Sequence, residues 1–192
     1  MPGAAWDFST PAAARQLRGW IAAGFLWGIH FGVPCNTWTR ARDRGPIKPA
    51  AGGTGWPSRL RSDKDLWGLP TLCFPPDVSK VEMSNRLVKN CISVWQVCVR
   101  REVPMTIENP GRSRLWLIPF LGKAAQRPHF SLATTHYCMD GCAWTKPTTF
   151  RSFRVNLSAV PKQCSGAQQC CDRTGKQHQV LSGRSPAGPL WT

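Results

Sequence analysis

The sequence predicts an α/β fold with a parallel sheet, because a helix followed by a strand occurs twice in series. Residues 10–24 carry the signals of an amphipathic helix, and the apolar run 25–33 follows it. A helical stripe over 79–99 is followed by the short apolar run 105–107. Two such units in series are typical of parallel strands joined by helical crossovers.

The first unit begins at Thr10, whose hydroxyl can cap a helix that has Pro11 in its first position. Apolar residues then recur at helical spacing, and Gly24 can end the helix. The run 25–33 is rich in strand-forming residues and is bounded by Pro34, so we expect a buried parallel strand there.

The second unit begins with a capping box, Ser79 with Glu82 three residues later. One apolar stripe follows, and we interpret it as core packing: Leu87, Val88, Cys91, Ile92, Trp95, Cys98 and Val99. The strand 105–107 should end at Glu108-Asn109-Pro110.

The remaining segments set the domain boundaries. Residues 34–80 are interrupted by Gly and Pro and indicate a long irregular loop, whereas 129–137 and 149–157 can each form a strand. We therefore expect one α/β domain over 1–157, and a polar Cys/His-containing tail over 158–192 that is loosely ordered.

The charge suits a polyanionic partner. The 192 residues carry 25 Lys+Arg against 10 Asp+Glu, a net charge of +15, which favours nucleic acid, although a solvated basic surface has the same charge. The positive residues are dispersed, which favours a groove or face over a basic arm.

Membrane insertion is not expected. The longest uncharged stretch, 19–39, contains His30 and Pro34, and its apolar part is too short for a spanning helix. A signal peptide is not expected either, because the apolar part starts late and Pro34 directly precedes Cys35. The nine cysteines show no clear disulfide framework, so we expect a reducing compartment, nucleus or cytoplasm.

Polar sequences follow both predicted strands. Pro34-Cys35 follows the first, and Glu108-Asn109 follows the second. Ligands of open α/β sheets bind beyond the carboxyl ends of the strands, so Cys35 and Glu108 should face one cleft as nucleophile and hydrogen-bonding acid. Taken singly, Cys35 can be an inert buried thiol, and Glu108 can pair with an arginine such as Arg112 or Arg114.

This pair of motifs resembles the two signatures of DNA cytosine-5 methyltransferases, Pro-Cys after one strand and Glu-Asn after the next. Asn36 and Pro110 stand where the family usually has Gln and Val. The resemblance implies an incomplete Rossmann-like, S-adenosylmethionine-dependent methyltransferase sheet with an irregular basic tail. It also implies that Cys35 forms a covalent adduct with cytosine in DNA, assisted by Pro34, Glu108 and Asn109.

The resemblance assigns further residues. Asp7 stands where the family has an acidic residue near the adenine of S-adenosylmethionine. Segment 137–151 stands where the family has a Gln-x-Arg-x-Arg strand, with Lys146 and Arg151 as its basic residues. The other residues expected to bind DNA phosphates are Arg40, Arg42, Arg44, Arg59, Arg61 and Lys64.

One expected motif is absent. The family begins with a strand and a Gly-rich turn that cradles the cofactor, and nothing similar precedes Asp7. We expect another chain to supply these strands, or the chain to be an inactive fragment. The sheet would then have an exposed edge. The alternative function is a non-catalytic basic nucleic-acid-binding remnant of a mobile-element-like reading frame.

A second cluster lies in the tail, comprising Cys164, Cys170, Cys171 and His178. Its spacing matches no standard zinc finger, so we expect no metal. A small zinc-assisted interaction module remains a third hypothesis.

Overall fold

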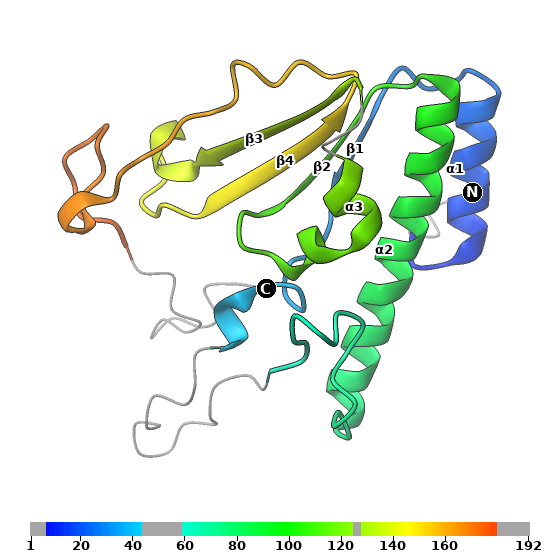
Figure 1. Ribbon diagram of the computed structural model, residues 1–192, viewed down its shortest axis with the longest axis horizontal. Coiled ribbons are helices and arrows are strands. Elements are labelled where there is room, and N and C mark those ends of the chain that lie inside the picture. The colour runs from blue at the N-terminus through cyan, green and yellow to red at the C-terminus, as the bar shows by residue number, and fades with distance from the viewer. Residues whose placement is uncertain (1–6, 44–58, 125–127, 180–192) are drawn as a thin grey trace, which may run out of the picture.

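The computed structural model describes residues 7–43, 59–124 and 128–179. Helices pack against one face of a four-stranded sheet (Figure 1). The helices and strands in chain order are α1 (Pro11–Ala22), β1 (Ile29–Gly32), α2 (Pro75–Arg101), β2 (Met105–Pro110), α3 (Pro119–Ala124), β3 (Phe130–His136) and β4 (Pro147–Phe153). Short 3-10 helices lie between and after them: η1 (Arg40–Asp43), η2 (Arg114–Leu117), η3 (Tyr137–Asp140) and η4 (Ala167–Gln169).

The strand order is β1-β2-β4-β3. β1 and β2 are parallel and α2 connects them, as the two helix-then-strand units predict. The sheet as a whole is mixed, because β4 runs antiparallel to both β2 and β3. The expectation of a parallel sheet therefore holds only for the first pair. The short connection between β3 and β4 explains the difference, since parallel neighbours need a long crossover.

The first helix forms as predicted, and the first strand is shorter than predicted. The Thr10 hydroxyl accepts a hydrogen bond from the backbone N–H of Ala13, and α1 begins at Pro11. β1 covers only four residues, and Phe25 and Trp27, placed in the strand by the sequence, are 71% and 96% exposed. In the described part of the chain β1 pairs only with β2, so it forms an edge of the sheet.

The long helix α2 begins four residues before the predicted capping box. Pro75 and Pro76 fit the first turn, where their missing N–H groups are not needed, and Asp77 adds a favourable charge there. Five residues of the helix that face the sheet are fully or nearly fully buried: Val88, Cys91, Val94, Trp95 and Cys98. β2 continues to Pro110, so Glu108 and Asn109 lie within the strand and not beyond it.

The residues after β4 fold back onto the sheet. Thr135 of β3 forms an isolated bridge with Lys162, and the Ser152 hydroxyl donates to the carbonyl of Val155 at 3.0 Å. We expected residues 158–192 to be loosely ordered, but as far as Gln179 the structure shows them in defined contacts. None of the described helices is both long enough and apolar enough to span a bilayer.

Arg61 lies inside the fold, where we expected a DNA contact. Its side chain is 0% exposed, and its guanidinium lies 3.7 Å from the ring centre of Trp38. It donates hydrogen bonds to the carbonyl and hydroxyl of Thr37 and to the carbonyl of Leu66. Burial lowers the pKa of Arg61 to about 10, so the group is charged at neutral pH. The expectation that Arg61 binds phosphate is therefore wrong.

Replacing Arg61 by Met should lower the free energy of unfolding by about 3 kcal/mol or more, because several buried carbonyl groups lose their donor. Urea unfolding followed by circular dichroism measures the change. Arg59→Met is the matched control, since Arg59 is 52% exposed and its ion pair with Asp43 should contribute less than about 1 kcal/mol. Equal effects of the two substitutions would contradict the structural role of Arg61.

Candidate functional site

Parallel pairing of β1 and β2 brings the two predicted motifs together. Gly32, the last residue of β1, is in register with Glu108 of β2, and Cys35 follows three residues later. A side chain at Gly32 would have its Cβ atom 3.9 Å from Oε2 of Glu108. The carboxylate therefore lies beside the backbone that leads into the Cys35 turn.

Asn109 fastens the end of β1. Its side-chain N–H donates to the carbonyl of Val33 at 2.7 Å, and both the bond and the side chain are buried. Its Oδ1 atom has no hydrogen-bond partner among the described residues. Asn109 thus holds the backbone two residues before Cys35.

A buried polar network fixes the turn that follows Cys35. The Cys35 carbonyl accepts hydrogen bonds from the N–H groups of Trp38 and Thr39, at 3.0 and 2.8 Å. The Thr37 hydroxyl and the Trp38 ring N–H both donate to the hydroxyl of Ser84 on α2, at 2.9 and 2.7 Å. Since Arg61 also binds Thr37, the turn is anchored to α2 through the core.

Tyr137 contacts the Glu108 carboxylate from the end of β3, the strand at the other edge of the sheet. It begins η3, and its hydroxyl donates to Oε1 of Glu108 at 3.4 Å. Lys146 lies over the Tyr137 ring, with Nζ 5.1 Å from the ring centre. Tyr137 was not predicted as a site residue, because only the pairing of β3 with β4 brings it close to Glu108.

The charges around Cys35 oppose one another. Burial is the largest cause and raises the pKa of the Cys35 thiol, Lys146 lowers it, and Glu108 raises it. A nucleophilic thiol is favoured by a lowered pKa, whereas the surroundings of Cys35 raise its pKa. Cys35 is thus a half-buried thiol, protonated at neutral pH, with one cation placed to favour its thiolate.

Arg151 does not reach this site. β4 residues alternate between the two faces of the sheet, so Phe150 is opposite Glu108 and Arg151 is opposite Ile107 of the core. The Arg151 guanidinium donates to the carbonyl of Leu121 and lies 4.6 Å from the ring centre of Trp116. The expected phosphate contact of Arg151 is therefore not supported, since its side chain is directed toward the helical face.

The other side chains predicted to bind phosphate differ in their partners within the protein. Arg40 pairs with Asp63 at 2.7 Å, Arg59 pairs with Asp43 at 3.3 Å, and Arg42 donates to the carbonyl of Asn36 at 2.8 Å. Lys64 is exposed, and Arg44 lies outside the described residues.

The same two aspartates also bind a buried arginine. Arg114, 1% exposed, contacts Asp43 and Asp63, whereas the sequence left open a pairing of Arg114 with Glu108. Three arginines therefore share two carboxylates, which leaves little free positive charge at this place.

Asp7 lies in the turn before the first helix. Hydrogen bonds from the side chain of Ser9 and from its N–H, the latter 2.8 Å from the Asp7 carboxylate, lower the pKa of Asp7. The neighbouring Phe8 stacks on Phe31 of β1, with ring centres 5.6 Å apart. These contacts place Asp7 beside the edge strand.

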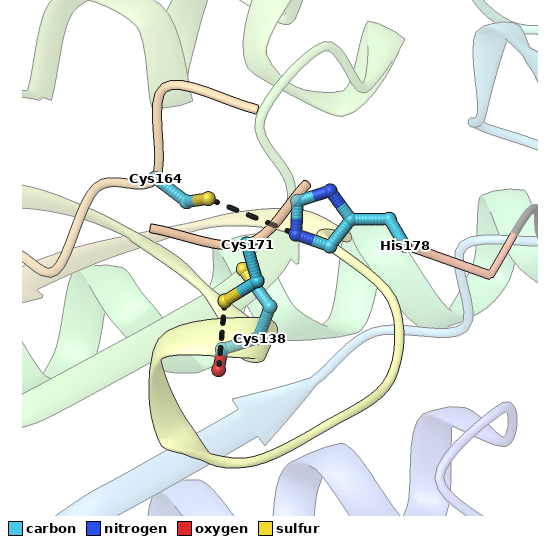
Figure 2. Close-up of side chains that lie close together, drawn as sticks. All are labelled: Cys138, Cys164, Cys171 and His178. Atoms are coloured by element: carbon cyan, nitrogen blue, oxygen red, sulfur yellow. Dashed lines mark hydrogen bonds between the residues drawn. The ribbon is translucent and has the colours of Figure 1, made fainter. Parts of the chain in front are cut away.

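A separate group of potential metal ligands lies beyond β3. The donor atoms of Cys138, Cys164, Cys171 and His178 are all within 4.8 Å of one another (Figure 2). The sequence drew attention to three of these residues, but it included Cys170 and missed Cys138. Cys138 was missed because it precedes β4, far from the others in the chain.

The opposite effects of Lys146 and Glu108 on the pKa of Cys35 can be tested by removing each charge in turn. Lys146→Met should raise the pKa of Cys35, because a nearby cation is lost, and Glu108→Gln should lower it, because a nearby anion is lost. The pH dependence of iodoacetamide alkylation, followed by mass spectrometry of the Cys35 peptide, measures both shifts. Shifts of the same sign in the two variants would contradict this geometry.

No protein-family model, no curated protein and no solved structure matches this chain.

Proposed function

We propose that this chain carries the nucleophile and base-binding half of a DNA cytosine-5 methyltransferase-like site. The supporting observation is the parallel pairing of β1 and β2, which places Glu108 beside the strand end that leads to Cys35. The Glu108 charge also raises the pKa of the Cys35 thiol, an effect that requires the two groups to lie near each other.

Cys35 is the nucleophile in this proposal. Its thiolate adds to carbon 6 of cytosine, and the displaced electron pair makes carbon 5 nucleophilic. Carbon 5 takes the methyl group and loses its proton, and the returning electron pair expels the thiolate. Since burial keeps the resting thiol protonated, we assign to Lys146 the task of favouring the thiolate.

Glu108 binds the base. A carboxyl group at this place can hydrogen-bond the ring nitrogen and the exocyclic amine of cytosine and so stabilise the charge that develops during attack. The Tyr137 hydroxyl holds one oxygen of Glu108 and thereby limits the rotation of the carboxylate. Tyr137 is a positioning residue in this scheme.

The methyl donor in this proposal is S-adenosylmethionine, which supplies an electrophilic methyl sulfonium. In a doubly wound sheet of order 3-2-1-4-5-6, strands 4 and 5 are parallel neighbours, and strand 1 pairs with the outer edge of strand 4. β1 and β2 have the connectivity of strands 4 and 5, and the outer edge of β1 has no described partner. We assign the cofactor-binding strands to this edge, with Asp7 nearby.

Exchange at carbon 5 tests the nucleophile without the methyl donor. Reversible addition of the thiolate lets carbon 5 take up a solvent deuteron and lose its proton. We expect the full chain to catalyse this exchange in a single-stranded cytosine oligonucleotide, whose base needs no flipping. Mass spectrometry of the recovered nucleoside measures the exchange.

The variants make this test specific. Cys35→Ser should reduce exchange to background, and Glu108→Gln should reduce it about 100-fold, as loss of a charge-stabilising group does. Cys142→Ser is the matched control, because Cys142 is also half-buried but lies in the β3–β4 connection. No exchange above background with the unmodified chain, or exchange that survives Cys35→Ser, would sink the proposal.

The net charge of +15 favours a second candidate, a nucleic-acid-binding protein without catalysis. If the described cations Arg40, Arg42, Arg59, Lys64 and Lys146 all contact phosphates of a duplex, the logarithm of the binding constant should fall with the logarithm of salt concentration with a slope of about −4.5. Fluorescence anisotropy at several salt concentrations measures this slope. Binding should be unchanged in Cys35→Ser, and salt-insensitive binding would contradict this candidate.

A further inference from the structure

Four potential metal ligands converge from two parts of the chain (Figure 2). Cys138 belongs to η3, directly after β3, whereas Cys164, Cys171 and His178 follow β4. All three thiols are buried, and the imidazole is half-buried. We propose that these four side chains bind one zinc ion in a closed tetrahedral site.

The donor set and its spacing suit zinc. Thiolate and imidazole are the ligands of structural zinc sites, and three sulfurs with one nitrogen complete its preferred four-coordination. Zn–S and Zn–N bonds of ordinary length at a tetrahedral angle place the sulfur and nitrogen about 3.6 Å apart. Sγ of Cys164 and Nε2 of His178 are 3.7 Å apart.

The backbone presents two of the ligands on a small hairpin. Cys170 bridges to Gln177, and the N–H of Cys171 donates to the carbonyl of Lys176 at 2.8 Å. Gly175 has a φ of +65° and closes the turn, donating to the carbonyl of Cys171 at 2.8 Å. Cys171 and His178 therefore come from opposite arms of the hairpin and point to the same place.

Hydrogen bonds from the backbone hold the third ligand. The N–H of Asp172 donates to Sγ of Cys164 at 3.4 Å, as is common for the sulfurs of metal sites. The N–H of Cys164 donates to Nδ1 of His136, at 3.2 Å. The second bond ties the ligand-bearing segment to the end of β3.

The described part of this segment has almost no apolar core of its own. The cluster buried beneath it consists of the three thiols, with only Met139 packed partly against them. A short segment without an apolar core folds when a metal or a disulfide supplies the missing free energy. A disulfide would use two of the thiols and leave the third thiol and His178 unexplained, whereas zinc uses all four groups.

The ion would join the tail to the candidate active site. Cys138 directly follows Tyr137, whose hydroxyl binds Glu108. Zinc would therefore fix the 3-10 helix from which Tyr137 extends. The zinc site does not depend on the proposed methyl transfer, because its ligands are all outside the Cys35 turn.

Metal analysis of the full chain, purified under reducing conditions and then equilibrated with zinc, tests the site. We expect about one zinc per chain by mass spectrometry of the metal, as for a structural site with four protein ligands. Cys171→Ser should weaken binding more than about 100-fold, because a ligand is lost. Cys170→Ser is the matched control, since this adjacent thiol is directed to the carbonyl of Gln168 and is not in the cluster.

Two further measurements guard against a misfolded variant. His178→Cys should retain zinc, because a fourth thiolate can replace the imidazole, whereas His178→Ala should lose it. Thiol titration of the unmodified protein should show no disulfide among the four positions. Failure of the reduced chain to hold zinc, equal losses in Cys170→Ser and Cys171→Ser, or a disulfide within the cluster would each overturn the zinc site.

Discussion

Burial of the Arg61 guanidinium is the constraint on which the candidate site depends. This cation lies under the Cys35 turn and reaches the turn, the segment around Leu66 and α2 at once. A buried cation is stable only when its donors are satisfied, so each of these segments is held in one place. Arg61 thus holds the turn that contains Cys35, whereas the pairing of β1 with β2 places Glu108 beside it.

The sequence predicted the parts of the fold in which local signals and packing agree. The Thr10 cap, the apolar stripe of α2 and the crossover between β1 and β2 are all observed. The order of β3 and β4 was out of reach, because strand pairing is set by contacts between distant residues. The start of α2 at Pro75 was missed, since a capping box at Ser79 was a stronger local signal than two prolines.

Some residues of the candidate site could also be predicted from the sequence, and others could not. Cys35 and Glu108 could be named because each follows or ends a strand and the two strands are parallel neighbours. Tyr137 and Cys138 could not, since they reach their partners through the β3–β4 connection. Arg61 was misassigned because a sequence shows the charge of a side chain but does not show whether the side chain is buried or exposed.

The outer edge of β1, which has no partner among the described residues, has a consequence for how the proposed site would be completed. Strand addition at such an edge relies on main-chain hydrogen bonds, so it tolerates many sequences in the added strand. Phe25 and Trp27, exposed directly before β1, give that edge an apolar flank. If the complementary strands belong to another molecule, the occupancy of a site completed there rises with the concentration of that molecule and falls on dilution.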